Sequence, residues 1–198
     1  MKTIFIDCSP KRKLSASGFI SRATQFFVSG NVSKEKLRTQ GDYKRIIEKI
    51  DDVDSIVFAM PLYVDGVPSH ILPFLKEVES KYKGLDAGKS VYVIANNGFI
   101  EGRQNEPLMQ VMENFCDRAG LTWRGGLGIG GGVMMNVMRI AYDTEKYSEE
   151  TKEKSKMVVY ESIETKMCWV RPYEMFIEKV DKNKYPDVKQ EYRFEEIW

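Results

Sequence analysis

The chain has 198 residues, 30% of them charged, and a formal net charge of +1. That length allows one α/β domain with a sizeable core, and the balanced charge argues against a nucleic-acid-binding protein, which usually carries a strong basic excess. The sequence contains neither an apolar run of transmembrane length nor a signal peptide after Met1, so we expect a cytoplasmic protein that associates with no membrane.

Patterns typical of strands and helices alternate along most of the chain. A strand buried on both faces appears as a continuous apolar run, and an amphipathic helix as apolar residues at i, i+3 and i+4. Strands are predicted over residues 2–7, 33–39, 55–60, 90–95 and 121–129. Helices are predicted over residues 15–28 and 42–51, within 68–82 and over 144–164. A helical stripe of Leu108, Val111, Met112, Phe115 and Ala119 predicts a further helix, which Asn105 or Glu106 can cap.

Proline and glycine residues mark two of the helix ends. Pro73 suits a first helical turn, so the regular helix within 68–82 is expected to begin there rather than at Pro68. Pro107 suits the first turn of the next helix, and Gly120 is typical of the position just after a helix ends. Each of these residues agrees with the periodicity around it.

Strands separated by helices predict a parallel sheet with helices on both faces, which is a doubly wound α/β fold with five strands. The alternation fades near residue 165, and the rest of the chain is rich in aromatic residues. These are Trp169, Tyr173, Phe176, Tyr185, Tyr192, Phe194 and Trp198. We therefore expect one domain over residues 1–165 and a C-terminal aromatic-rich extension over residues 166–198.

Ligands of open parallel sheets bind beyond the carboxyl ends of the strands. The first predicted strand leads into Ser9–Ser17, where a loop meets the start of a helix. Unpaired backbone N–H groups and the positive end of the helix dipole favour a phosphate there. On this segment alone, the alternative is an ordinary turn with a capping serine. The side chains that suit a phosphate are the hydroxyls of Ser9, Ser15 and Ser17 and the cations of Lys11, Arg12 or Lys13.

Two further loops follow the third and fourth predicted strands. Residues 60–68 offer apolar and aromatic surface with backbone N–H groups, and residues 96–102 offer amides and a glycine that lets a backbone approach closely. Each has a structural alternative, a strand terminator at Pro61 and an ordinary turn at Asn97-Gly98. Together with the first loop, they suit a flat heteroaromatic ligand with a phosphorylated tail.

Three motifs carry a resemblance to a known family: Ser9-Pro10-Lys11 with Ser15 and Ser17, Pro61-Leu62-Tyr63, and Asn96-Asn97-Gly98-Phe99. On these motifs the chain resembles the flavodoxin-like NAD(P)H-dependent FMN reductases and quinone reductases over about residues 1–165. The resemblance implies the strand order 2-1-3-4-5 and bound FMN, with the phosphate on the first motif and the isoalloxazine ring on the other two. The implied FMN-binding residues are Ser9, Lys11, Ser15, Ala16, Ser17, Pro61, Leu62, Tyr63, Val64, Asn96, Asn97, Gly98 and Phe99.

The same resemblance implies an oxidoreductase that takes a hydride from NADPH or NADH onto the flavin and passes electrons to a small acceptor, such as free flavin or a quinone. The cofactor carries this chemistry, so no catalytic side chain is expected from the protein. A homodimer or higher homo-oligomer is implied as well. Two alternatives remain: an FMN-binding electron carrier, and a flavodoxin-like binding module without NAD(P)H turnover. Electron carriers of this kind tend to be strongly acidic, so the near-neutral charge favours the reductase.

Several other signals point to no function of their own. Residues 126–131 match GxGxxG, but the strand and acidic residue that a dinucleotide site requires do not follow. We therefore expect close backbone packing or a flexible strand end near the flavin. A single histidine, His70, without a GxSxG motif argues against a Ser–His–Asp hydrolase. The three cysteines are widely spaced, which predicts reduced thiols and no metal site.

Overall fold

The computed structural model describes residues 1–11, 15–85, 87–132, 157–161, 168–172, 177–183, 186 and 191. The strands are β1 (Lys2–Asp7), β2 (Asn31–Lys36), β3 (Ser55–Pro61), β4 (Ser90–Asn96), β5 (Thr122–Ile129), β6 (Met157–Glu161) and β7 (Cys168–Pro172). The helices are α1 (Ala16–Gln25), α2 (Tyr43–Asp51), α3 (Leu72–Tyr82) and α4 (Glu106–Ala119). Short 3-10 turns are η1 (Gln40–Asp42), η2 (Ser69–Ile71) and η3 (Gly102–Asn105).

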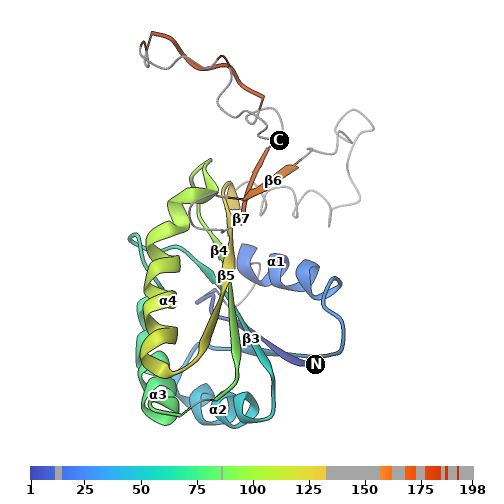
Figure 1. Cartoon of the computed structure of the whole chain (residues 1–198), viewed down its shortest axis with the longest axis vertical. Helices are drawn as coiled ribbons and strands as arrows, with labels where there is room; N and C mark the ends of the chain where they lie inside the picture. Colours follow the sequence, from blue (N-terminus) through green and yellow to red (C-terminus); the bar gives the residue numbers. More distant parts are fainter. Residues whose placement is uncertain are drawn as a thin grey trace.

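The strands form one sheet in the order β2-β1-β3-β4-β5-β7-β6 (Figure 1). Neighbouring strands from β2 to β5 are all parallel. The prediction of five parallel strands in the order 2-1-3-4-5 is therefore confirmed. Beyond β5, the sheet continues with β7, which is parallel to β5, and with β6, which is antiparallel to β7. Strand β7 falls within the predicted extension.

The prediction of a helix over residues 144–164 is wrong where the structure describes that segment. Residues 157–161 form β6 and pair with β7 from Met157↔Pro172 to Glu161↔Cys168. The sequence Met-Val-Val-Tyr-Glu contains β-branched and aromatic residues that favour a strand. The charged pattern that suggested a helix lies largely before it, and residues 144–156 and 162–164 fall outside the described residues.

The ends of the other predicted helices agree with the structure to within a few residues. Helix α1 ends at Gln25 rather than at residue 28. Helix α3 begins at Leu72 with Pro73 in its first turn, after the 3-10 turn η2. Gly120 follows α4 in the left-handed conformation (φ 69°), and its N–H group donates to the carbonyl of Asp117. The proline and glycine signals therefore marked real helix ends.

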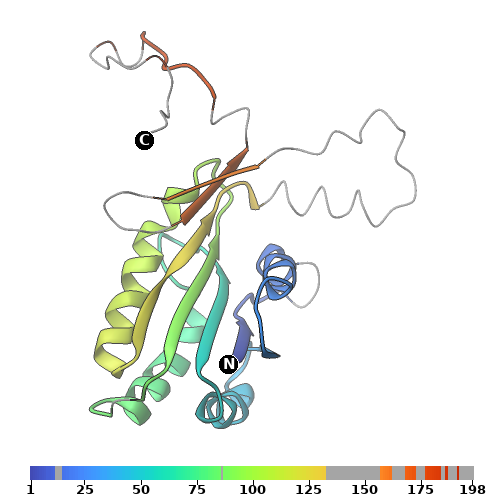
Figure 2. The ribbon, with the colours of Figure 1, turned by 45° about the vertical axis from the view of Figure 1, so that its right-hand side comes forward.

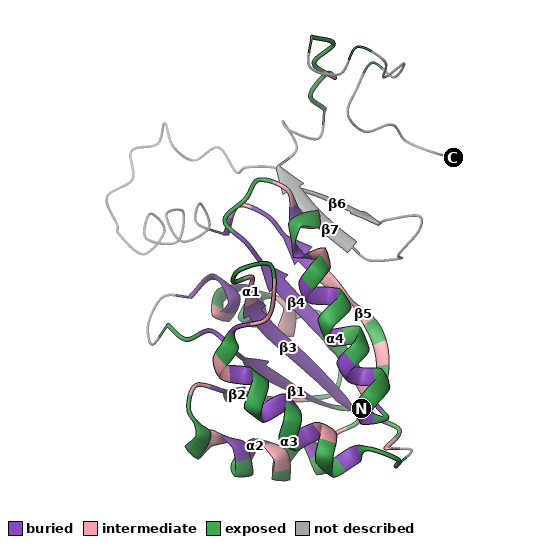
Figure 3. Cartoon of the chain, turned by 90° about the vertical axis from the view of Figure 1, so that its left-hand side faces the viewer, coloured by how far each residue is buried: buried purple, intermediate pink, exposed green. Residues whose placement is uncertain are grey.

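Two apolar layers cover the two faces of the sheet. The larger layer joins alternate strand residues, such as Ile4 and Ile6 of β1, to the buried sides of α2, α3 and α4. The smaller layer contains Phe5 of the same strand and Ile20 of α1. Figures 1 and 2 accordingly show α1 on the side of the sheet opposite α3 and α4. Figure 3 shows buried residues on the sheet-facing sides of the helices.

Strand β2 lies at the outer edge and spans residues 31–36 rather than the predicted 33–39. Its register is set by parallel pairing with β1, from Lys2↔Asn31 to Asp7↔Lys36. Glu35 is buried on this strand and forms ion pairs with Arg45 and Lys49 of α2. Tertiary ion pairs therefore tie this polar strand to the helix that covers it.

Candidate functional site

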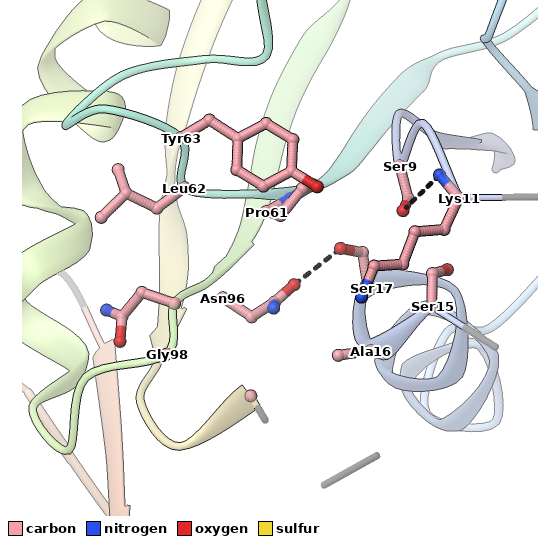
Figure 4. Close-up of a pocket in the computed structure, with 12 residues that line it drawn as sticks. Ser9, Lys11, Ser15, Ala16, Ser17, Pro61, Leu62, Tyr63, Asn96 and Gly98 are labelled. Carbon is pink, nitrogen blue, oxygen red and sulfur yellow. Dashed lines mark hydrogen bonds between the residues drawn. The ribbon is translucent and has the colours of Figure 1, made fainter. Parts of the chain in front are cut away.

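The loops after β1, β3 and β4 meet at the carboxyl edge of the sheet, because these three strands are neighbours. Together with the chain that follows β5, they enclose a cavity of about 130 Å³ (Figure 4). Its lining residues are Ser9, Lys11, Ser15, Ala16, Ser17, Pro61, Leu62, Tyr63, Asn96, Asn97, Gly98 and Gly132. Eleven of the thirteen residues predicted for FMN binding are among them, all except Val64 and Phe99.

One wall of the cavity is the first turn of α1. Ser15 is the N-cap, and its Oγ accepts a hydrogen bond of 3.0 Å from the N–H group of Gly18. Ala16 and Ser17 come next, and helix geometry leaves their N–H groups without partners inside the helix. The side chain of Lys11 runs from its loop toward this turn (Figure 4). The wall therefore combines backbone donors, a helix dipole and a cation, which suits an anion.

The end of β1 approaches this helix closely. A Cβ atom at Gly18 would lie only 2.7 Å from Ser15 Oγ and 3.0 Å from Asp7 Oδ2, so a side chain there would displace the capping serine. The Asp7 carboxylate is buried, and its Oδ1 accepts a hydrogen bond of 3.1 Å from the N–H group of Ser9. The glycine thus lets the N-terminal turn of α1 pack against the start of the loop.

A buried hydrogen bond joins α1 to the end of β4. Ser17 Oγ donates to Asn96 Oδ1 at 2.6 Å (Figure 4). The Ser17 hydroxyl proton is thereby engaged, which leaves its backbone N–H group as the donor available to a ligand. Beside Asn96, the side-chain amide of Asn97 donates to the carbonyl of Glu101 at 3.1 Å. Its buried Oδ1 has no hydrogen-bond partner among the described residues.

The opposite wall consists of Pro61, Leu62 and Tyr63 at the end of β3. Tyr63 is 41% exposed, so its ring offers apolar surface at the mouth of the cavity. Reciprocal 3.0 Å backbone hydrogen bonds between Tyr63 and Gly66 close a tight turn behind it. Both central residues of this turn have positive φ, 47° for Val64 and 52° for Asp65, which is a rare conformation for the β-branched Val64.

Val64 and Phe99 lie outside the cavity lining. Val64 occupies the tip of the turn after Tyr63 and is fully exposed. Phe99 is 59% exposed, and its carbonyl accepts a 2.6 Å hydrogen bond from the N–H group of Gly131. Each of the two follows directly, in the sequence, a residue that lines the cavity: Val64 follows Tyr63, and Phe99 follows Gly98.

The glycine-rich end of β5 packs directly on the loop after β4. Gly131 and Gly132 donate backbone hydrogen bonds to Phe99 and Asn97, at 2.6 and 2.7 Å. A Cβ atom at Gly130 would lie 2.2 Å from the Ile100 carbonyl oxygen. The GxGxxG match is therefore a site of close backbone packing, one of the two readings expected for it. Gly132 lines the cavity and was missed, because its place there depends on contacts with Asn96 and Asn97, which lie far from it in the sequence.

The Cys8 thiol near this edge does not line the cavity. Cys8 is fully buried at the end of β1, and burial, followed by the nearby Asp7 charge, raises its pKa well above the usual value. His70 does not line the cavity, and its Nε2 lies 3.3 Å from the Leu37 carbonyl oxygen. In the part of the chain that the structure describes, no cluster of three His, Cys, Asp or Glu residues could hold a metal ion. Within the same residues, every helix is too short or too polar to span a membrane.

Comparison with known proteins finds one family match in the C-terminal part of the chain and similar folds among solved structures. A family described as "Protein of unknown function (DUF1653)" matches residues 138–196, which lie largely outside the described residues. No curated protein matches the sequence. Among solved structures, the Trp repressor binding protein from Bacillus subtilis is 22% identical with a TM-score of 0.55 and covers 74% of this chain and 99% of its own.

Two other structures share the same architecture. An NADPH-quinone reductase from P. pentosaceus is 18% identical with a TM-score of 0.53, covering 74% of this chain and 100% of its own. A WrbA-like flavodoxin from Agrobacterium tumefaciens is 14% identical with a TM-score of 0.50, covering 62% of this chain and 75% of its own. At these identities the likeness concerns the fold, and the predicted flavodoxin-like fold is thereby confirmed.

Proposed function

We propose that this protein binds FMN at the carboxyl edge of its sheet and acts as an FMN-dependent NAD(P)H oxidoreductase that reduces a small acceptor such as free flavin or a quinone. The observation that carries the proposal is the shared cavity. The first turn of α1 and Lys11 face the same space as the apolar surface of Pro61–Tyr63. An anion site beside a flat apolar surface matches the two ends of FMN.

The residues present fit FMN at each part of the cavity. The N–H groups of Ala16 and Ser17, with the Lys11 ammonium group, would hold the phosphate. The enclosed volume of about 130 Å³ is smaller than the roughly 300–1,000 Å³ of sites that enclose a whole ligand. We therefore place only the phosphate and part of the ribityl chain inside. The ring would lie against Leu62 and Tyr63 at the mouth.

The loop after β4 would hold the other edge of the ring. Gly98 lets the backbone come close, and the buried Asn97 Oδ1 is an acceptor without a donor among the described residues. The imide N–H group of a flavin is a donor of the kind that this oxygen lacks. When bound, FMN supplies the hydride and electron transfer, and the side chains bind and orient it.

The first test is a fluorescence titration with FMN and riboflavin. We expect FMN to bind at least about tenfold more tightly, because charge-assisted hydrogen bonds to the phosphate are absent in riboflavin. Lys11→Ala should weaken FMN and leave riboflavin unchanged, whereas Lys83→Ala, on the far side of the molecule at the end of α3, should change neither. Equal affinity for the two flavins would contradict the phosphate site.

Steady-state oxidation of NADH and NADPH then separates the reductase from the two alternatives. A reductase consumes the nucleotide continuously when free flavin or a quinone is present. An electron carrier would hold FMN without such turnover, and a binding module would hold no flavin. The homo-oligomer, which the family resemblance implies, and the cytoplasmic location, which was expected from the sequence itself, remain predictions. Gel filtration with light scattering tests the former.

A further inference from the structure

Arg38 reaches the start of the cavity loop from a different part of the chain. It lies just after β2, and its Nη2 donates a 2.7 Å hydrogen bond to the carbonyl of Lys11. Its Nε donates to the carbonyl of Ser9 at 3.3 Å, and Nη2 is also 3.9 Å from Asp7 Oδ2. A single guanidinium group therefore contacts both ends of the 9–11 segment and the strand before it.

Among the described residues, the other hydrogen bonds of the 9–11 segment are local. The N–H group of Ser9 donates to Asp7 Oδ1 and that of Lys11 to Ser9 Oγ, both between residues two apart. The bonds from Arg38 span 27 and 29 residues and connect the segment to the loop after β2. Arg38 thus supplies a tie from another element, with the rigid planar fork that suits two acceptors at once.

The two carbonyl oxygens that Arg38 engages matter for an anion site. A carbonyl oxygen carries partial negative charge and repels a phosphate if it turns toward it. Arg38 does not line the cavity. The carbonyl oxygens of Ser9 and Lys11 therefore accept hydrogen bonds from a guanidinium group that lies outside the cavity lining. The side chain of Lys11, in contrast, points toward the first turn of α1 (Figure 4).

We propose that Arg38 is a positioning residue for the phosphate of FMN, which it never touches: by holding the carbonyls of Ser9 and Lys11, it fixes the 9–11 segment in the shape that presents Lys11 to the anion. This inference rests on the proposed FMN site. It predicts an effect on phosphate recognition alone, because the polar contacts of the Arg38 guanidinium group among the described residues are with Asp7, Ser9 and Lys11, away from the Pro61–Tyr63 surface where the ring would lie.

The binding test compares FMN and riboflavin in Arg38→Ala and Arg38→Lys. We expect Arg38→Ala to weaken FMN about tenfold, the range for losing hydrogen bonds to a charged group, with riboflavin unchanged. Arg38→Lys should recover part of the loss, because an ammonium group can hold one carbonyl. Arg118→Ala is the matched control, since that guanidinium pairs with Glu79 across α3 and α4. An unchanged FMN affinity, or equal losses for both flavins, would overturn the proposal.

Asp7→Asn separates positioning from simple charge balance. The substitution keeps an acceptor for the N–H group of Ser9 and removes the carboxylate that Arg38 faces. If Arg38 acts by holding carbonyls, Arg38→Ala still weakens FMN about tenfold in the Asp7→Asn background. If the loss disappears there, Arg38 only neutralises Asp7 and the positioning role is wrong.

Hydrogen exchange tests the same role without any flavin. The peptide that contains residues 9–11 should exchange faster in Arg38→Ala than in the unsubstituted protein or in Arg118→Ala. Unchanged exchange would overturn the proposal whether or not FMN binds. A protein that fails to bind FMN defeats the proposed function instead, so the two failures are distinct.

Discussion

Two cysteine thiols, Cys8 and Cys116, are buried in the larger apolar layer. Burial raises the pKa of Cys116 to about 12, and the nearby charges of Asp117 and Glu113 act in the same direction. Both thiols therefore stay protonated at pH values where an exposed cysteine ionises, near 8.5. They behave as small apolar side chains of the core.

The raised pKa of Cys116 predicts a loss of stability at alkaline pH. Below about pH 8.5 both the folded and the unfolded states hold the proton, so the contribution is complete. Between that pH and about 12 the unfolded thiol loses its proton first, and the free energy of unfolding falls as pH rises. Urea denaturation from about pH 8 to about pH 10 should show about 2 kcal/mol less decline in Cys116→Ala than in the unsubstituted protein. An identical decline would contradict the assignment.

At the scale of elements, the end of β5 determines how the first turn of α1 meets β4. A Cβ atom at Gly132 would lie 2.7 Å from Asn96 Nδ2 and 2.8 Å from the Asn97 carbonyl oxygen. We expect Gly132→Ala to push the Asn96 side chain away from Ser17 and break their 2.6 Å hydrogen bond. The free energy of unfolding should fall by about 1–3 kcal/mol, because a buried acceptor loses its donor. FMN affinity should fall with it, and both are measurable by denaturation and titration.

Gly41→Ala is the control for this substitution. Gly41 lies in η1, and the nearest atom to a Cβ there is Thr39 Oγ1 at an ordinary 3.7 Å. Its unfolding free energy and FMN affinity should therefore stay close to those of the unsubstituted protein. Unfolding free energy and FMN affinity in Gly132→Ala equal to those of this control would contradict the prediction. They would mean that the chain after β5 shifts to accommodate the methyl group and that the Ser17–Asn96 hydrogen bond is kept.

The accuracy of the sequence-based prediction varied with the source of each signal. The apolar runs of β3 and β4 are local signals, so their bounds were predicted to within one residue. Strand β2 was misplaced because pairing with β1 and the ion pairs of Glu35 with α2 determine it. The prediction of a helix over residues 144–164 was wrong at 157–161, because the charged helical pattern was extended into the β-branched sequence of β6.

The same distinction holds for the candidate site. Three loops at neighbouring strand ends follow from the alternation of strands and helices, and eleven predicted residues line one cavity. Gly132 and Arg38 could not be placed in this way. Their contacts with Asn96 and with Ser9 join segments about 30 or more residues apart, and a local pattern carries no sign of such contacts.

At the scale of the whole molecule, the sheet depends on its C-terminal strand. Strand β7 pairs with β5 over Leu127–Ile129 and with β6 along its whole length. Truncation after Thr165 removes β7 and leaves the outer edge of β5 without this partner. We expect the truncated chain to melt several degrees lower and to associate more readily, measured by thermal denaturation and gel filtration.

This truncation also bears on the role of the aromatic extension. A truncated protein with the same melting temperature, oligomeric state and FMN affinity would show that residues 166–198 add nothing to the domain. Loss of stability with the oligomeric state unchanged would favour docking of the extension on its own subunit. Loss of a dimer together with weaker FMN binding would favour a subunit contact beside the flavin.

The position of β1 between β2 and β3 also has a consequence for how the protein is made. Both sheet neighbours of β1 lie within the first 61 residues, since it pairs with β2 and β3. Because the chain is synthesised from its N-terminus, these three strands leave the ribosome before β4 does. This early part of the chain contains Lys11 and the first turn of α1, which form the wall suited to an anion. It also contains Arg38 and the Pro61–Tyr63 surface. The Asn96–Gly98 side of the cavity is the part that joins them last.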